Sequence, residues 1–319
     1  MSDDPLLARL PPELARRVQT ARLTDGRLTI VADVSGIAAA GREGFERDLR
    51  TALAAQPGVV EIHVALTADK PARRMIAVGS GKGGVGKSTL TTNLAVALAR
   101  AGRRMGVVDA DIYGPSQPML LGTADAKPES SGDKLVPVPT GFGVSVLSMG
   151  HLIAPGRAIA WRGPMAGKAL GQLIEAEWGD AELLLVDLPP GTGDVQLTML
   201  QRFKPDGAVI VSTPQDLALI DAARAGQLLE SAGVPVIGLV ENMAGYRCPH
   251  CGEWSDPFGH GGIEAAAARM DLPFLGRIPL APTIREASDR GVPPAAGDDA
   301  EGAAFAGIAA ALGEWLDRN

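Results

Sequence analysis

One run of glycines and lysines in this chain is suited to holding phosphate, since residues 79–89 read GSGKGGVGKST. From Gly81 to Ser88 the run satisfies the pattern G-x-x-x-x-G-K-[S/T]. In such a loop successive backbone N–H groups converge on phosphate oxygens, and the following helix adds the partial positive charge of its N-terminus. Only glycine lets the backbone come that close. The sequence therefore predicts a nucleotide-binding site.

Each part of this loop has an expected task. Lys87 is expected to reach the β- and γ-phosphates, and the Ser88 hydroxyl is expected to ligate Mg²⁺. Residues 74–79 read as a short buried strand and residues 87–100 as a helix, so strand, loop and helix follow in the required order. The residues predicted to bind the nucleotide are Gly81, Lys82, Gly83, Gly84, Val85, Gly86, Lys87, Ser88 and Thr89.

Aspartates follow two further apolar runs. Asp187 ends the run 181–186, and an aspartate at the carboxyl end of a core strand can orient Mg²⁺ through water. The glycines that follow, up to Asp194, permit a switch loop that senses the γ-phosphate. Asp109 and Asp111 lie where another strand ends, and ligands bind at that edge of an open α/β sheet. We expect Asp111 to position the attacking water; a helix cap or turn is the alternative for either residue.

The chain has two cysteines, Cys248 and Cys251, in a C-x-x-C spacing. With no secretion signal in the sequence, metal ligands or a redox pair are expected rather than a structural disulfide. A cubane iron–sulfur cluster needs four thiolates, and a symmetric dimer of this chain supplies four. Zinc accepts the same thiolates, with His250 or His260 as further candidate ligands. Spacing therefore leaves iron–sulfur, zinc and redox chemistry open.

Bulk composition excludes several classes of protein. The 319 residues are 46% hydrophobic, which suits one large α/β domain with a small appendage. A net charge of −7 and the lack of any basic run argue against a nucleic-acid partner. The first ten residues contain no apolar segment, and no stretch approaches the length of a membrane span. We therefore expect a cytoplasmic protein without a membrane partner.

The pattern of elements predicts two domains. Residues 1–70 are expected to form a small α+β module, with strands at 28–34 and 59–66 and a helix at 43–55, followed by a polar linker. Residues 74–319 alternate short strands with helices, which is typical of an α/β fold whose mostly parallel sheet is flanked by helices. A surface loop is expected at 122–143 and a last helix at 303–316. The predicted strands are 75–79, 105–109, 144–149, 183–187, 208–212, 236–241 and 274–278.

A second lysine in the loop, Lys82, resembles the deviant phosphate loop of the MinD/ParA/nitrogenase-iron-protein class of dimeric P-loop ATPases. The resemblance implies that Lys82 reaches across a dimer to the partner's nucleotide. Within that class the chain looks like the Mrp/ApbC family of iron–sulfur cluster carriers, over roughly residues 74–290. The strings that carry this likeness are residues 109–118, 187–194, 241–243, 248–251 and 258–262. By this resemblance Asn242 contacts the adenine.

The resemblance implies a homodimer that slowly hydrolyses ATP, holds a [4Fe-4S] cluster between the Cys248 and Cys251 pairs of two chains, and passes it to apo-proteins. Lys82, Lys87, Asp111 and Asp187 would be its catalytic residues. The alternatives are a MinD- or ParA-like positioning ATPase and a metal-insertion ATPase handling zinc or nickel. The amino-terminal module is similar to the small domain that many bacterial members carry, but it lacks their cysteine, so a docking or structural role is expected.

Overall fold

The computed structural model describes residues 10–34, 37, 39–54, 56–67, 73–152, 163–191 and 193–319. Predictions for the first nine residues, Ala55, the linker residues 68–72 and Thr192 therefore lie outside the described residues. The chain folds into two compact units, residues 1–72 and 73–319.

The amino-terminal unit is a three-stranded sheet in the order β1 (Val18–Thr24), β2 (Arg27–Asp33) and β3 (Glu61–Thr67). Strand β2 pairs antiparallel with β1 and parallel with β3. Helix α2 (Ala39–Ala54) supplies Leu49 and Leu53 to a core that also holds Leu28 and Ile30, and a short helix α1 (Pro12–Ala15) precedes the sheet. Strand β1 was not predicted, because most of its residues are polar and exposed.

The second unit contains a nine-stranded sheet whose seven central strands run parallel, in the order β14-β12-β11-β4-β10-β5-β9. Short strands β8 (Val138–Pro139) and β13 (Trp254–Ser255) pair antiparallel with β9 and β12. The predicted α/β fold with a mostly parallel sheet is confirmed. The parallel strands are β4 (Arg74–Gly79), β5 (Met105–Asp109), β9 (Val144–Ser148), β10 (Leu183–Asp187), β11 (Gly207–Ser212), β12 (Val236–Arg247) and β14 (Phe274–Leu280).

Two predictions in this unit need correction. The segment 122–143, predicted as a loop, contains β8 and a separate hairpin of β6 (Glu129–Ser131) and β7 (Lys134–Val136). These strands are two or three residues long, too short to show a period in the sequence. Strand β12 continues six residues beyond its predicted end at Glu241. That extension carries the chain toward the cysteines.

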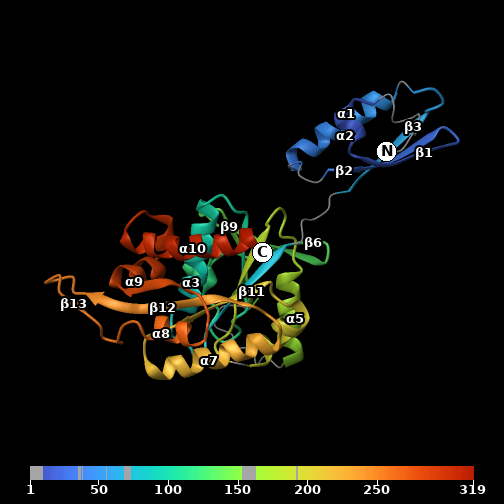
Figure 1. Cartoon of the computed structure of the whole chain (residues 1–319). Coiled ribbons are helices and arrows are strands. Elements are labelled where there is room, and N and C mark those ends of the chain that lie inside the picture. Colours follow the sequence, from blue (N-terminus) through green and yellow to red (C-terminus); the bar gives the residue numbers. More distant parts are fainter. Residues whose placement is uncertain are drawn as a thin grey trace. The chain divides into compact units, whose positions relative to one another are not determined.

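Helices cover both faces of the sheet (Figure 1). Helices α3 (Lys87–Arg100) and α10 (Ala300–Arg318) pack on one face, where Leu94 and Phe305 share a core. Helices α5 (Gly163–Ile174), α7 (Asp216–Ser231) and α8 (Gly262–Arg269) contribute to a second core on the opposite face. Burial on both faces explains the continuous apolar runs of the strands. The remaining helices include α4 (Gln117–Leu120), α6 (Asp194–Thr198) and α9 (Pro282–Asp289).

Parallel strands bring the ends of distant segments to one edge of the sheet. Gly79, Asp109, Asp187 and Ser212 end neighbouring strands there, and Glu241 pairs in register with Ser212. Ligands of open α/β sheets bind at this edge. In the described part of the chain, no helix combines the length and apolar character needed to cross a bilayer.

Candidate functional site

The phosphate-binding loop connects β4 to α3 and lines a pocket of about 290 Å³. Its last residue, Gly86, caps α3 with a φ of 85°, a conformation that favours glycine. A Cβ at this position would lie 2.0 Å from Asn242 Nδ2, so glycine is also required for space. The predicted residues that line the pocket are Lys82, Gly83, Gly84, Gly86, Lys87, Ser88 and Thr89. Val85 instead buries its side chain in the core.

Asp187 holds Lys87, the lysine of the loop that is expected to be catalytic. Lys87 Nζ lies 2.5 Å from Asp187 Oδ1, and both side chains are buried. The other carboxylate oxygen accepts a 2.9 Å hydrogen bond from Gln117 Nε2, which also donates to the Ser88 carbonyl. Both oxygens of Asp187 are therefore engaged within the chain, and the carboxylate fixes the position of the lysine beneath the loop.

Asp109 lies beside Asp187 and is equally buried. Its carboxylate accepts hydrogen bonds from the Ser148 hydroxyl at 2.8 Å and from the backbone N–H groups of Gln117 and Asp111. Burial and the neighbouring charge of Asp187 raise the pKa of Asp109 to about 7, although these hydrogen bonds act in the opposite direction. Asp109 therefore organises the turn after β5 rather than facing the pocket.

Asp111 is the aspartate of this turn that faces the phosphate pocket. Its Oδ1 accepts the backbone N–H groups of Tyr113 and Gly114, and its Oδ2 lies 3.8 Å from Lys87 Nζ. The side chain is thus held in place with one oxygen left toward the lysine. This placement supports the expected water-positioning role of Asp111, which stays a prediction.

The residues around the loop fit a magnesium ion in their chemistry. Mg²⁺ prefers oxygen donors and is commonly bound through one or two protein groups together with substrate phosphates. The Ser88 hydroxyl and the Asp111 carboxylate both line the phosphate pocket. Asp187, which was expected to orient the ion through water, is fully buried beside them and bonded to Lys87.

Lys82, the second lysine of the loop, is bound within its own chain. Its Nζ donates to Gln215 Oε1 at 3.2 Å, and Gln215 precedes the first residue of α7. Both side chains are at the surface. A lysine that acts on a partner's nucleotide has to leave this contact.

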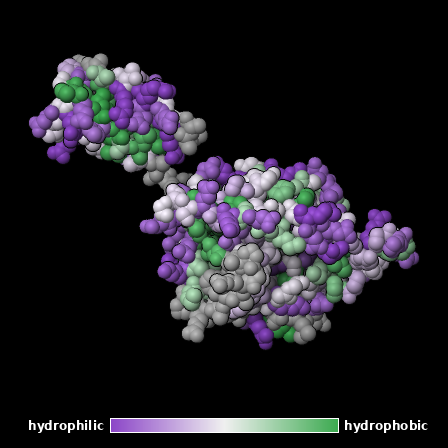
Figure 2. Space-filling view, turned by 180° about the vertical axis from the view of Figure 1, so that it is seen from behind, coloured by the Kyte–Doolittle hydropathy of each residue, from purple (hydrophilic) through white to green (hydrophobic). Residues whose placement is uncertain are grey.

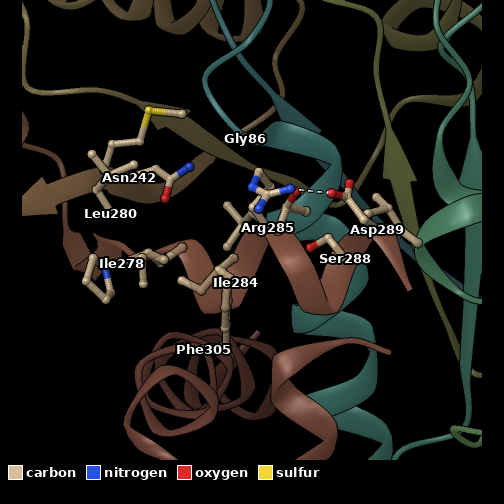
Figure 3. A pocket seen from close by; sticks show the side chains of 15 residues that line it. Gly86, Asn242, Ile278, Leu280, Ile284, Arg285, Ser288, Asp289 and Phe305 are labelled. Atoms are coloured by element: carbon tan, nitrogen blue, oxygen red, sulfur yellow. Dashed lines mark hydrogen bonds and ion pairs between the residues drawn. The ribbon is translucent and has the colours of Figure 1, made fainter. Parts of the chain in front are cut away.

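A second pocket of about 270 Å³ adjoins the phosphate pocket and is mainly apolar (Figure 3). The two share Gly86, Thr89 and Leu120. Asn242 sits between loop and pocket: its Nδ2 donates to the Val85 carbonyl at 2.7 Å, and its amide oxygen points away from the loop. A phosphate-binding loop and an apolar pocket that adjoin in this way are compatible with the expected binding of one nucleotide. The apolar residues lining the second pocket include Ile278, Leu280, Ile284 and Phe305.

Both cysteines lie at the tip of a hairpin formed by β12 and β13. The hairpin extends beyond the sheet (Figure 1) and is visible from behind as a narrow protrusion (Figure 2). Cys248 follows the last residue of β12, and its backbone N–H donates to the Glu253 carbonyl. Gly252 donates back to the Cys248 carbonyl, which closes the turn around both thiols. Cys251 is exposed and Cys248 is half-buried.

The turn favours the thiolate form of Cys248. Hydrogen bonds from the backbone N–H groups of Cys251 and His250 lower the pKa of the Cys248 thiol. Thiolates are the form that binds soft metals. In the described residues, no group of three or more His, Cys, Asp and Glu side chains is arranged to hold a metal ion. Because the chain contains two cysteines, a four-thiolate site would need two further thiolates from outside this chain.

Several residues of the site were not assigned from the sequence. Gln117 and Glu241 lie in strings that were recognised, and Gln215 lies three residues after the predicted strand 208–212, but no role was assigned to their side chains. Gln117 occurs in a Pro-Ser-Gln-Pro string that begins six residues after the predicted strand end at Asp109, and this string is the signal that could have identified it. The side-chain partners of these three residues lie 20 or more residues away in the sequence, so the contacts themselves could not be predicted locally.

Comparisons with known proteins agree with this geometry. The family model described as ParA, NUBPL iron-transfer P-loop NTPase, matches residues 71–312. The iron-sulfur cluster carrier protein of Salmonella typhimurium is 48% identical over 223 residues, which cover 69% of this chain. The match covers 60% of that relative, so the chain spans less than two thirds of its length.

Solved structures show the same fold. A nucleotide-binding protein of Archaeoglobus fulgidus in complex with ADP, with cobalt found by PIXE, is 42% identical with a TM-score of 0.60, covering 68% of this chain and 86% of that one. The cell division ATPase MinD of Pyrococcus furiosus is 28% identical with a TM-score of 0.57, and the match covers 76% of this chain and 99% of that one. These likenesses confirm the predicted P-loop NTPase fold and the resemblance to iron–sulfur cluster carriers.

Proposed function

We propose that this protein is an ATP-dependent carrier of iron–sulfur clusters. The premise is that the chain belongs to the ParA family of NUBPL iron-transfer P-loop NTPases. The observation that carries this proposal is the course of β12. Asn242 of this strand contacts the phosphate-binding loop, and Cys248 follows the last residue of the same strand. Nucleotide and thiols are thus connected by one continuous element.

The nucleotide half of the activity uses the two adjoining pockets. ATP would place its phosphates on the loop, with Lys87 at the β- and γ-phosphates, and its adenine in the apolar pocket beside Asn242. Bound Mg²⁺ would neutralise charge on the phosphates. Asp111 would orient a water for attack on the γ-phosphorus, breaking the bond to the bridging oxygen and releasing ADP, phosphate and a proton.

The cluster half uses the hairpin tip. Two chains related by a two-fold axis supply four thiolates from their Cys248 and Cys251 pairs, which suffice for one [4Fe-4S] cluster. Transfer to an apo-protein is then an exchange of ligands. Each iron–thiolate bond to the carrier is replaced by one to the acceptor, and the proton of the acceptor thiol passes to the released carrier thiolate.

Lys82 would link the two halves through the dimer. In the single chain it is held by Gln215, and in a dimer it would reach the partner's phosphates. Assembly of the four-thiolate site would therefore depend on the nucleotide state. Because such coupling is reciprocal in binding free energy, cluster binding would alter nucleotide affinity by the same factor.

Anaerobic reconstitution with iron and sulfide tests this function. The wild type should gain a broad visible absorbance with about two iron atoms per chain, as one four-iron cluster shared by two chains requires. Cys248→Ser and Cys251→Ser should each lose it. A Cys248→Ser variant that kept the spectrum, or a chain that stayed monomeric with every nucleotide and metal, would contradict the proposal.

Two further measurements separate the alternatives. Elemental analysis of protein purified without oxygen would find zinc or nickel instead of iron if the hairpin served metal insertion. Sedimentation with liposomes or DNA in the presence of ATP would reveal a positioning ATPase, the activity suggested by the structural likeness to MinD. The cysteine hairpin favours the carrier, because positioning on a membrane or DNA has no use for two adjacent thiols.

A further inference from the structure

Strand β12 is irregular at Met243, where its regular pairing with β14 (Phe274–Leu280) is interrupted. The backbone φ of Met243 is 59°, in the left-handed region that a non-glycine residue adopts at a cost of about 1 kcal/mol. Asn242 pairs with Ile278 of β14 and the next pair is Tyr246 with Leu280, so three residues of β12 stand opposite one of β14. Bulges of this kind bend a strand. Met243 thus begins the outward leg of the cysteine hairpin.

The base of the hairpin is fixed on both legs by the two residues before Met243. Asn242 ties the outward leg to the phosphate-binding loop through its 2.7 Å hydrogen bond to the Val85 carbonyl. Glu241 is fully buried, and its carboxylate accepts the backbone N–H groups of Gly261 at 3.1 Å and Ile263 at 2.8 Å, where the chain returns into α8. The direction of the hairpin is therefore set by the backbone just beyond these anchors.

Met243 also lines the apolar pocket next to the phosphate-binding loop. Of the three bulged residues of β12, Met243 is the one that lines the pocket, and Pro279 lines it from the opposite strand β14. A nucleotide base that enters the pocket would contact the Met243 side chain. Phosphates bound on the loop would lie next to the hydrogen bond between Asn242 and the Val85 carbonyl. The apolar pocket thus borders the base of the hairpin, and Met243 is the residue there whose backbone has an uncommon conformation.

We propose that Met243 is a positioning residue that transmits nucleotide occupancy into the direction of the hairpin bearing Cys248 and Cys251. Two hairpins must present their thiols to one cluster, so a change of direction alters how well four ligands converge. This inference rests on the proposed function for its role in cluster transfer, but its test needs no metal.

Trp254 reports the hairpin in the metal-free protein, because it is 58% exposed and its ring packs against Gly245. ADP at saturating concentration should change the tryptophan emission of the wild type, and Trp254→Phe should remove that change. Met243→Asn keeps a residue that tolerates the left-handed region, whereas the β-branched Met243→Val opposes it. Both substitutions remove the methionine side chain from the pocket, so calorimetry should show similarly weakened ADP binding in the two variants. A difference between their tryptophan responses therefore reports the effect of the backbone conformation at residue 243.

Met243→Asn should retain at least about half of the ADP-dependent change in tryptophan emission. In Met243→Val that change should be about fivefold smaller than in the wild type, or less. A Met243→Val variant that binds ADP and responds like the wild type would overturn the inference, as would a wild type whose Trp254 does not respond. If Met243→Val does not fold, hydrogen exchange of the wild type decides: ADP should alter exchange at residues 243–255, and unchanged exchange there overturns the proposal. Failure of the carrier function would show instead as absent iron loading with the Trp254 response intact.

Discussion

Asp109 and Asp187 occupy paired positions on the neighbouring parallel strands β5 and β10, so two buried carboxylates lie side by side beneath the phosphate-binding loop. Lys87 compensates one of them through its 2.5 Å contact with Asp187. Asp109 is stabilised by neutral donors, among them the Ser148 hydroxyl. Burial and the Asp187 charge therefore raise the pKa of Asp109 to about 7.

This arrangement predicts a pH-dependent stability difference between the wild type and Asp109→Asn. Between pH of about 4 and 7 the folded chain retains a proton on Asp109 that the unfolded chain releases, so the wild-type free energy of unfolding falls as pH rises through this window. Asparagine does not titrate. The difference, wild type minus variant, should decrease by up to about 4 kcal/mol from pH 4 to pH 8.

Urea unfolding of both proteins at several pH values measures that difference. Asp298→Asn serves as the control, because Asp298 is an exposed partner of Arg100 far from the buried pair. A difference that stays level or grows with pH would contradict the raised pKa.

Gln117 connects three parts of the phosphate site. Its fully buried amide donates to the Ser88 carbonyl and Asp187 and accepts from the Thr92 hydroxyl at 2.6 Å. Gln117→Leu leaves these groups without their partner, so we expect a loss of about 2–4 kcal/mol in unfolding free energy. ATP affinity should also fall, because Asp187 and Lys87 lose their support.

Urea unfolding and calorimetric titration with ATP check this prediction. The matched control is Gln227→Leu, since Gln227 is an exposed glutamine on α7. Equal stability of the two variants would show that the Gln117 network contributes nothing.

The contact between Lys82 and Gln215 competes with action of Lys82 on a partner chain. Gln215→Ala removes the acceptor, and we expect ATP-dependent dimer formation to rise about two- to fivefold, as the loss of one surface hydrogen bond allows. Gln215→Glu should hold Lys82 more tightly through an ion pair, so ATP-dependent dimer formation should fall. Analytical ultracentrifugation with ATP measures both. The same rank order persisting in a Lys82→Ala background would show that the effect does not pass through this lysine.

Two glycines in the hairpin allow a matched test of its geometry. Gly245 and Gly252 both have a positive φ, 76° and 74°, but a Cβ at Gly245 would lie 2.0 Å from the Trp254 ring, whereas at Gly252 the nearest Arg247 atom is 3.8 Å away. Alanine strains the backbone at either site by about 1 kcal/mol. Gly245→Ala should also displace Trp254.

Iron content after reconstitution should therefore fall several-fold more in Gly245→Ala than in Gly252→Ala. Thermal unfolding of the two variants should remain similar, because the hairpin extends beyond the cores of the unit. Equal iron loading in both variants would argue that packing of Trp254 on Gly245 does not set the position of the thiols.

Much of the fold could be read from local patterns. Strands β5 and β10 have the predicted bounds, because each is a short apolar run closed by an aspartate, and helix α3 has them because it follows the glycine-rich loop directly and carries apolar residues at helical spacing. The phosphate-binding loop was equally evident, since its glycines are required by backbone geometry at that position. Strand β1 was missed because most of its residues are polar and exposed, and β6 and β7 were missed because three residues are too few to show a period.

Residue types and their spacing alone established a phosphate site, a pair of thiols and the α/β class, because each depends on neighbours within a few residues. The relationships that join these parts needed the folded chain. Asn242 reaches Val85 across 157 residues, Gln117 reaches Asp187 across 70, and Lys82 meets Gln215 across 133. Side chains brought together by strand order leave no mark on the sequence beside them, so the connection between the nucleotide pocket and the cysteine hairpin becomes visible only when the sheet is assembled.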